Sequence, residues 1–443
     1  MVQVSEIRTK PPCRREDALA VTRRLRDAGH VAYFAGGCVR DTLLGLEPAD
    51  WDVATDAPPD VVRRTFANTQ AVGAAFGVIL VRIGHSHVEV ATFRRDGQYL
   101  DGRRPRDVQF TDAEHDAQRR DFTINGLFLD PLADGGQRVI DYVGGLADLS
   151  AKVLRAIGNP DERFAEDHLR MLRAARFAAR FALEIEPRTE QAIVRDAGKL
   201  IAISPERIGE ELRRMLTAPT RALAWPTLDR LGLLAPCFRF LPGVDRAKAA
   251  PAVRSILLAL APGSPIDFPL ALAAATLEIR WHAAGDGPDI RSLLVAAALH
   301  DCHRAMRRCL RISNEESDGM TRTLAGIASL LDDRYPSLAA RKRFAAGATA
   351  ASSRRLLDAI AAVGLHEQRI AQLRQDLSQL DGQDVAPRPL VSGDDLTAMG
   401  LTPGPMFKAV LDAVYDAQLE GRLADRDSAL DAARREAAAR AGR

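Results

Sequence analysis

The stretch from Tyr33 to Thr55 constrains the chain most, because it places a strand, a turn, a helix and two acidic residues in direct succession: YFAGGCVRDTLLGLEPADWDVAT. Apolar residues 31–35 predict a strand, and residues 39–46 predict a short amphipathic helix. The paired Gly36 and Gly37 between them permit backbone conformations closed to other residues and allow a bulky anion to approach the main chain. The N–H groups at the start of the helix favour an anion at the same place. The stretch therefore predicts an anion-binding turn.

Two aspartates follow on the next predicted strand. Asp50 and Asp52 are two residues apart, so both carboxylates face the same side of a strand. Hard carboxylate oxygens hold Mg²⁺, and substrate phosphates can complete its shell. A glycine pair or a D-x-D pattern alone is common on protein surfaces. Their succession here indicates a nucleotide held by glycines and metal, ready for phosphoryl or nucleotidyl transfer.

Composition narrows the class of protein. A chain of 443 residues suggests two to four domains, and its formal net charge of +2 excludes a protein that binds nucleic acid through bulk positive charge. Arginines cluster locally, however, at Arg119-Arg120 and at Arg170, Arg173 and Arg176. The five cysteines are scattered and form no C-x-x-C pair, which argues against a disulfide framework or a structural zinc site. We expect a cytoplasmic protein, because no signal peptide or membrane-spanning run is evident.

The distribution of strand and helix signals divides the chain. An amphipathic helix is expected over residues 14–29 and a short one over 58–65. Strands are expected at residues 31–35, 51–54, 78–83, 88–93, 122–129 and 139–142. From residue 146 the pattern is helical, with a loop-rich interruption at 387–405 and a final solvated helix at 429–443 that frays at its end. The predicted fold class is α+β, with a mixed β-sheet head followed by an all-helical remainder.

Glu89 is a candidate third acid. It lies on the predicted strand HVEVATFR, on the same side as Ala91 and Phe93 by alternation. If this strand neighbours residues 51–54 in the sheet, Glu89 joins the aspartates and could ligate metal or accept a proton. The alternative is a glutamate at the rim, paired with Arg82 or Arg94.

The segment RRDFTIN, residues 119–125, combines phosphate-binding and polar side chains. Arginines present forked donors to phosphate. Asp121 and Asn125 enter an apolar predicted strand, where polar groups need partners such as sugar hydroxyls. The alternative is a helix-capping aspartate and an asparagine at a strand edge.

The segment EDHLRMLR, residues 166–173, is expected on one helix. Asp167 and Arg170 are three residues apart and would share a face, with Arg173 one turn further. A carboxylate beside a guanidinium can meet the donor and acceptor edge of cytosine or adenine. The alternative is a surface ladder of ion pairs.

Three further segments carry weaker signals. The run from Ser204 to Leu212 is a capped helix start, expected to place and support its neighbours. His300-Asp301 raises the possibility of an HD-type metal phosphohydrolase, but a partly buried structural histidine is favoured. The turn around Gly400 and Gly404 can offer backbone N–H groups to a phosphate.

GGCVRD followed by DWDVAT resembles the head domain of the class II tRNA nucleotidyltransferase and bacterial poly(A) polymerase family, and RRDFTIN and EDHLR resemble its later motifs. The resemblance implies an enzyme that adds nucleotides to RNA 3′ ends without a nucleic-acid template. It implies two Mg²⁺ ions at Asp50 and Asp52, with Glu89 as a catalytic third acid. The implied nucleotide-binding residues are Gly36, Gly37, Arg40, Arg120, Asp121, Asn125, Asp167, Arg170, Arg173 and Arg176.

The resemblance also implies domains and partners. A nucleotidyltransferase head would span 14–145, a base-selecting neck 146–216, a helical body 217–330 and an RNA-binding tail 331–443. The substrates would be a tRNA 3′ end, CTP and ATP, with no obligate protein partner and no membrane. The loop DGQYLDGRRP, residues 96–105, favours complete CCA addition, whereas Ala74-Ala75 stands where the family pattern has a basic or polar residue. A poly(A) polymerase, a specialist adding CC or A, an HD-type phosphohydrolase and a catalytically inactive RNA-binding module remain alternatives.

Overall fold

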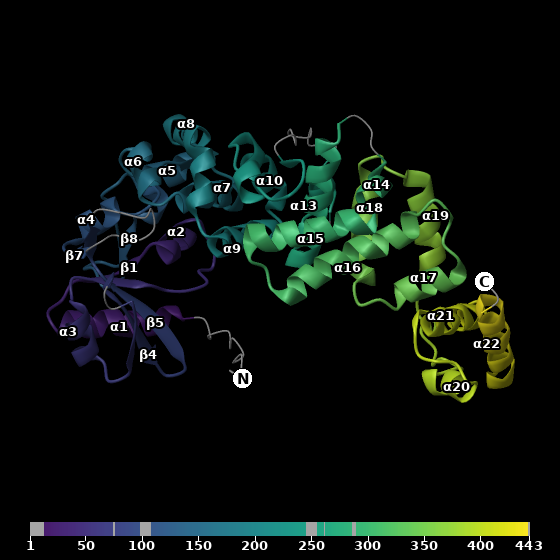
Figure 1. Ribbon diagram of the computed structural model, residues 1–443. Helices are drawn as coiled ribbons and strands as arrows, with labels where there is room; N and C mark the ends of the chain where they lie inside the picture. The colour runs from purple at the N-terminus through teal and green to yellow at the C-terminus, as the bar shows by residue number, and fades with distance from the viewer. Residues whose placement is uncertain are drawn as a thin grey trace. The chain divides into compact units, whose positions relative to one another are not determined.

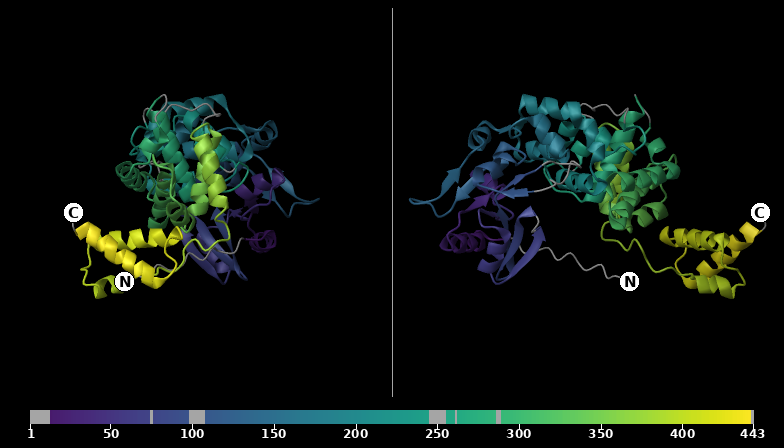
Figure 2. Two further views of the ribbon diagram at one scale, coloured as in Figure 1. Left: turned by 90° about the vertical axis from the view of Figure 1, so that its right-hand side faces the viewer. Right: turned by 60° about the vertical axis from the view of Figure 1, so that its left-hand side comes forward.

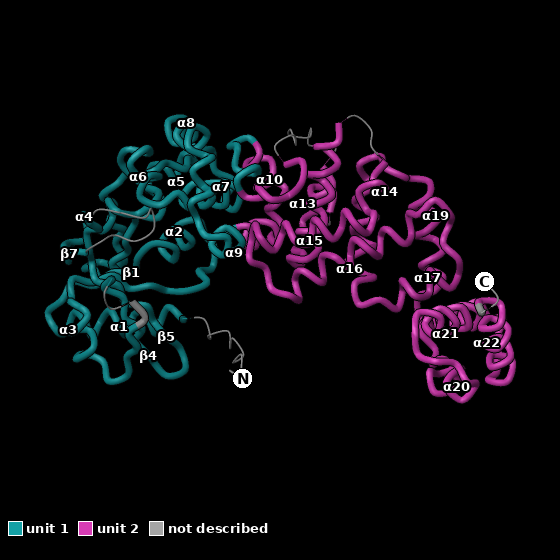
Figure 3. The backbone as a smooth tube through the Cα atoms, in the orientation of Figure 1, with its two compact units in different colours: residues 1–211, 230–236 teal, residues 212–229, 237–443 magenta. Residues whose placement is uncertain are grey.

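The computed structural model describes residues 13–73, 76–97, 108–244, 255–260, 262–285 and 289–441. The chain forms two compact units (Figure 3): Met1–Glu211 with Arg230–Pro236, and Leu212–Asp229 with Cys237–Arg443. The first unit groups the predicted head with the neck, and the second groups the body with the tail; the finer division into four domains stays a prediction. The predicted α+β fold class is confirmed, since the large sheet lies in the first part of the chain and helices make up the rest (Figures 1 and 2).

A seven-stranded mixed sheet forms the centre of the head, in the order β3-β4-β5-β2-β1-β8-β9. Its strands are β1 Ala32–Ala35, β2 Val53–Thr55, β3 Thr69–Gly73, β4 Val78–Ile83, β5 Ser86–Thr92, β8 Phe128–Asp130 and β9 Arg138–Ile140. β2, which directly follows the two aspartates, pairs antiparallel with β1 on one side and parallel with β5 on the other. A separate hairpin joins β6 (Arg94–Asp96) to β7 (Val108–Phe110). Most of the predicted loop 96–105, and Ala74-Ala75, lie outside the described residues.

Short helices connect and cover these strands. They are α1 Arg15–Asp27, α2 Gly37–Leu43, α3 Pro59–Thr65 and α4 Ala113–Gln118. α1 buries Ala18, Val21 and Leu25, the inward face that its periodicity predicts. The predicted strand at 122–129 is wrong in its first half: Thr123–Asn125 form a 3₁₀ turn, and the strand begins at Phe128. Because of this turn, the polar side chains of Asp121 and Asn125 lie on the same side of an apolar segment and are hydrogen-bonded to each other.

The neck continues the first unit with helices and two short strands. Its elements are α5 Gly145–Ala151, β10 Val153–Leu154, α6 Pro160–Glu166, α7 Leu169–Phe181, β11 Glu184–Ile185, α8 Pro187–Asp196, a 3₁₀ helix Ala197–Ala202 and α9 Pro205–Leu216. α7 is buried along most of its length, including Met171, Leu172 and Ala175. Each large apolar side chain buried in this way contributes about 1.5–3 kcal/mol to folding. α7 is therefore a firm support for the side chains at its start.

The second unit is helical. Its elements are α10 Arg221–Arg230, α12 Ile256–Ala259, α13 Phe268–Ala283, α14 Ile290–Leu293, α15 Ala296–Leu310, α16 Asn314–Leu331, α17 Leu338–Ala345, α18 Ala350–Ala362, α19 Glu367–Ser378, α20 Gly393–Ala398, α21 Pro405–Leu419 and α22 Arg426–Ala441. The short helix α11, Leu234–Cys237, belongs to the first unit except for its last residue. The expectation of a solvated last helix is wrong, because α22 buries Ala429 and Ala433 against Val410 and Val414 of α21. Within the described ranges, no helix has both the length and the apolar character needed to cross a bilayer.

Candidate functional site

The glycine turn lies directly behind the central strand β1. Gly36 has a φ of 72°, a conformation that side-chain-bearing residues rarely adopt. A Cβ at this position would lie 2.8 Å from Arg120 Nη1, so the guanidinium already occupies that space. The turn therefore requires glycine for two independent reasons. It also brings Arg120 of the RRDFTIN segment next to the predicted anion site.

The acidic residues gather at the adjoining end of the sheet. Asp50 and Asp52 lie just before β2, and the parallel register that pairs Val53 with Val90 sets Asp52 alongside Glu89. The sequence-based condition for a third acid, that the two strands be neighbours, is thus met. Burial raises the pKa of Asp52 to about 7, and the charges of Glu89 and Asp50 add to the effect while Arg120 opposes it.

The donor chemistry of this group suits a hard cation. Asp52 is half-buried, whereas Asp50 and Glu89 are exposed. Burial, followed by the negative charges of Glu89 and Asp50, raises the pKa of Asp52, and a divalent cation would relieve the repulsion among these carboxylates. Across the described ranges, no group of three or more His, Cys, Asp or Glu side chains is arranged to hold a metal by itself. Two aspartates plus phosphate oxygens from a substrate are the set that fits.

The RRDFTIN and EDHLR segments meet in one buried network. Asp121 accepts hydrogen bonds from Asn125 Nδ2 at 2.9 Å and from Arg173 Nε at 2.7 Å. Burial alone would raise the pKa of Asp121, but the Arg173 charge, the Asn125 hydrogen bond and Arg170 together lower it to about 2. Arg40 Nη1 in turn donates to Asn125 Oδ1. Asp121, Asn125 and Arg173, predicted from separate motifs, are therefore brought together.

Arg40 and Arg176 take part in packing between elements. Arg40 is 4% exposed, pairs with Asp41, and lies 4.4 Å from the ring centroid of Phe181 on α7. Arg176 pairs with Glu211 at 3.1 Å. The triphosphate contact expected of Arg40 stays a prediction. What the structure shows is that Arg40 joins α2 to α7.

The expectation that Asp167 and Arg170 share one helix is wrong. α6 ends at Glu166, Asp167 is extended (φ −151°, ψ 104°), and α7 begins at Leu169. The Asp167 carboxylate accepts the Leu169 N–H at 3.0 Å, so it binds the first residue of the new helix from the break between the two helices. Arg207 of α9 also binds this carboxylate with both terminal nitrogens. Arg170, 9% exposed, pairs with Glu166 and donates to the Arg119 carbonyl.

Sequence reasoning missed several of these partners. Asp116 of α4 binds Arg119 and Arg120, which directly follow that helix, at the three- and four-residue spacings that the sequence already displays. Local spacing could have found this group. Arg207 lies far from Asp167 along the chain, and no local pattern joins the two.

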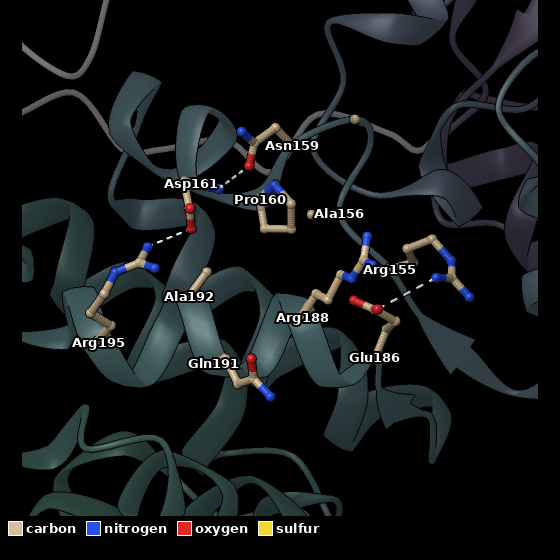
Figure 4. Close-up of a pocket in the computed structure, with 11 residues that line it drawn as sticks. Arg155, Ala156, Asn159, Pro160, Asp161, Glu186, Arg188, Gln191, Ala192 and Arg195 are labelled. Carbon is tan, nitrogen blue, oxygen red and sulfur yellow. Dashed lines mark hydrogen bonds and ion pairs between the residues drawn. The ribbon is translucent and has the colours of Figure 1, made fainter.

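Two cavities lie near the neck. One of about 650 Å³ opens between the start of α6 and α8, and in Figure 4 its Arg195 faces Asp161 while Arg155 faces Glu186. Arg188 also lines the cavity, so three arginines stand against two acids there, and none of the predicted nucleotide-binding residues lines it. A second cavity, of about 330 Å³, is lined by Arg119 and Glu166 beside the motifs described above.

His300 does not form a buried structural site. It is exposed on α15 rather than partly buried as expected, and the adjacent Asp301 pairs with Arg304 at 2.7 Å. His303 lies nearby, with ring centroids 6.5 Å apart.

Acidic side chains on neighbouring segments of a sheet, a glycine turn and an arginine beside both are an arrangement that suits a nucleotidyltransferase. Comparison with known proteins agrees. The poly A polymerase head domain matches residues 32–155, and the probable RNA and SrmB-binding site of polymerase A matches residues 182–247. The CCA-adding enzyme of Lactiplantibacillus plantarum is 33% identical over 430 residues, which is 96% of this chain and 97% of that protein. The chain belongs to the family of CCA-adding enzymes and bacterial poly(A) polymerases.

Other relatives match over a smaller share of this chain and of their own length. Poly(A) polymerase I of Salmonella typhi is 45% identical over 234 residues, and this match, like that to several other curated relatives, spans about half of each protein. The crystal structure of the Bacillus stearothermophilus CCA-adding enzyme in complex with CTP is similar over 97% of this chain and 99% of that one, with a TM-score of 0.72 and 28% identity.

Proposed function

We propose that the protein is a CCA-adding enzyme, which extends tRNA 3′ ends from CTP and ATP without a nucleic-acid template and releases diphosphate. One observation carries the proposal: Arg120 joins the glycine turn at Gly36 to the acidic group around Asp52, where a triphosphate and a reacting hydroxyl could meet. The similarity along nearly the whole chain to a protein named a CCA-adding enzyme supports this choice over poly(A) polymerase, whose match covers half of each chain. We place this activity in the cytoplasm.

Asp50 and Asp52 would hold two Mg²⁺ ions together with the substrate phosphates. Bound there, Mg²⁺ would neutralise the triphosphate and increase the acidity of the tRNA 3′-hydroxyl. Glu89, which the strand register sets alongside Asp52, would accept the proton of that hydroxyl. Gly36 and Gly37 would admit phosphate oxygens to the main chain, and Arg120 would bind them.

The remaining predicted residues would fix the nucleotide. Asp121 and Asn125 would bind the ribose hydroxyls, and Arg173 holds Asp121 in place for this contact. Arg40 holds Asn125 in the same way. Asp167 and Arg170 would read the base, because a carboxylate accepts from an exocyclic amino group while a guanidinium donates to the ring acceptors.

An extension assay tests the function. A tRNA transcript that ends at the discriminator base is incubated with Mg²⁺ and with CTP, ATP or both. Arrest after three added residues, with CTP required before ATP, supports CCA addition. Long tails from ATP alone on any RNA end would establish poly(A) polymerase instead, and arrest after two cytidines would establish a CC-adding specialist.

A further inference from the structure

The Asp167 carboxylate has three occupied acceptor positions. Oδ1 accepts the Leu169 N–H at 3.0 Å and Arg207 Nη1 at 3.2 Å, and Oδ2 accepts Arg207 Nη2 at 2.6 Å. A carboxylate offers about four lone-pair positions. Counting partners in the described part of the chain, one position is left, and it belongs to Oδ2.

A single remaining acceptor selects among nucleobases. Cytosine and adenine carry an amino group, a donor, where uracil and guanine carry a carbonyl oxygen, an acceptor. A carboxylate oxygen attracts the first two and repels the others. The occupancy of Asp167 therefore matches the two bases of the CCA sequence, provided that Oδ2 keeps a fixed direction.

Arg207 supplies that fixed direction. Asp167 lies in the break between α6 and α7 and belongs to neither helix, so only the contacts of its own carboxylate fix its side chain. The Leu169 N–H contacts only Oδ1 and leaves the carboxylate free to turn about that contact. The two parallel contacts from Arg207 fix the carboxylate plane, as paired guanidinium–carboxylate bonds do. The Asp167 side chain is 16% exposed and that of Arg207 24%, so solvent reaches the pair only partly.

We propose that Arg207 is a specificity-determining positioning residue: it occupies two acceptor positions of Asp167 and orients the last one toward the amino group of an incoming cytosine or adenine. This inference rests on the proposed function, because it assumes that Asp167 reads the base. Arg207 itself does not touch the nucleotide.

A merely structural ion pair predicts something different. If Arg207 only fastened α9 to the α6–α7 break, its loss would lower stability and would slow addition of all four nucleotides alike. Orientation of Asp167 predicts instead that the ratio of correct to incorrect addition changes. The ratio of kcat/KM values separates the two roles, since a general loss of active protein cancels in it.

The experiment compares Arg207→Gln, Arg207→Lys and the matched control Arg195→Gln in the full-length protein. Arg195 also belongs to the neck and pairs with an acid, Asp161, but it lines the cavity of Figure 4, to which Asp167 does not contribute. The measured quantities are kcat/KM for CTP against UTP on a tRNA that lacks CCA, and for ATP against GTP on a tRNA that ends in CC. Thermal unfolding of each variant is followed in parallel.

Arg207→Gln should lower both ratios about tenfold, the scale of one bidentate contact in base discrimination. Arg207→Lys keeps the charge but loses the fork, and should recover part of the ratio; Arg195→Gln should match the wild type. Unchanged ratios in a folded Arg207→Gln protein overturn the inference. If that variant does not fold, an unchanged ratio in Arg207→Lys overturns it equally. A wild-type protein that does not add CCA refutes the proposed function instead.

Discussion

Replacing Asp121 by Asn should remove one charge from the buried network without changing its shape. Oδ1 of Asp121 accepts from the Phe122 N–H and from Asn125, and Oδ2 accepts from Arg173. An amide can keep its oxygen at the Oδ1 position. Its NH₂ group then faces Arg173, so a donor meets a donor and the half-buried guanidinium loses its counter-charge.

The magnitude follows from the pKa of Asp121. The network lowers it from 3.8 to about 2, so the folded protein favours the ionised form by roughly two pKa units, or about 2–3 kcal/mol. Because the folded-state value is depressed, this stability is fully present above the unfolded-state pKa near 4 and is lost as the pH falls toward 2. Asp121→Asn should therefore cost about 2–3 kcal/mol at pH 7 and pH 5, and less at pH 3.5.

Urea unfolding combined with pulsed hydrogen exchange measures the difference in free energy of unfolding between the variant and the wild type, segment by segment. Peptides from residues 108–181 report on the network, and the comparison is made at pH 7, 5 and 3.5. Asp161→Asn is the control, since Asp161 also pairs with an arginine but is 54% exposed in its side chain and should contribute at most about 1 kcal/mol. A difference below about 0.5 kcal/mol at pH 7, or one that does not shrink at pH 3.5, would refute the reasoning.

Four further outcomes are expected. Asp52→Asn should abolish nucleotide addition yet unfold at the same or a higher temperature, because a neutral amide avoids the cost of burying a charge and the repulsion by Glu89 and Asp50, which together raise the Asp52 pKa; a lower unfolding temperature would contradict this. Gly36→Ala should raise the KM for CTP and ATP and cost about 1 kcal/mol or more, since its Cβ meets Arg120 at positive φ; unchanged kinetics would show that the turn is not used. Asp167→Ala should reduce base choice more than rate, and retained CTP/ATP discrimination would exclude Asp167 as the base reader. His300→Ala should leave nucleotide addition intact, and release of phosphate lost only in this variant would support the HD-type alternative.

The sequence predicted the central part of the head well because its signals are local. The strands around Val53 and Val90 each carry their strand signal within a few residues. The glycine pair and D-x-D follow one another in the chain, so their succession can be read directly from the sequence. That the two strands are neighbours could be stated only as a condition, because pairing in a sheet depends on residues far apart in sequence.

The errors arose where one side chain overrides local propensity. Residues 166–173 are mostly strong helix formers and predict one helix. The structure instead has a break at Asp167, whose carboxylate binds the Leu169 N–H and Arg207, and sequence periodicity cannot reveal the contact with Arg207. Residues Thr123–Asn125 form a 3₁₀ turn where the sequence predicts a strand, because apolar content of this kind fits a strand and a buried turn equally well.

The buried arginines explain how the parts of the site keep their spacing. Arg40 follows the glycine turn by one helical turn, and its guanidinium packs on Phe177 and Phe181 of α7 while pairing with Asp41. Asp41 also binds Arg180 of α7 at 3.0 Å. A buried ion pair contributes little net stability over a well-packed apolar contact, but it tolerates few alternative geometries. α2 carries the turn assigned to the triphosphate, and α7 begins beside the residues assigned to the base. In the proposed function, fixing one helix to the other would set the distance between the two ends of the nucleotide site, as base selection without a nucleic-acid template requires.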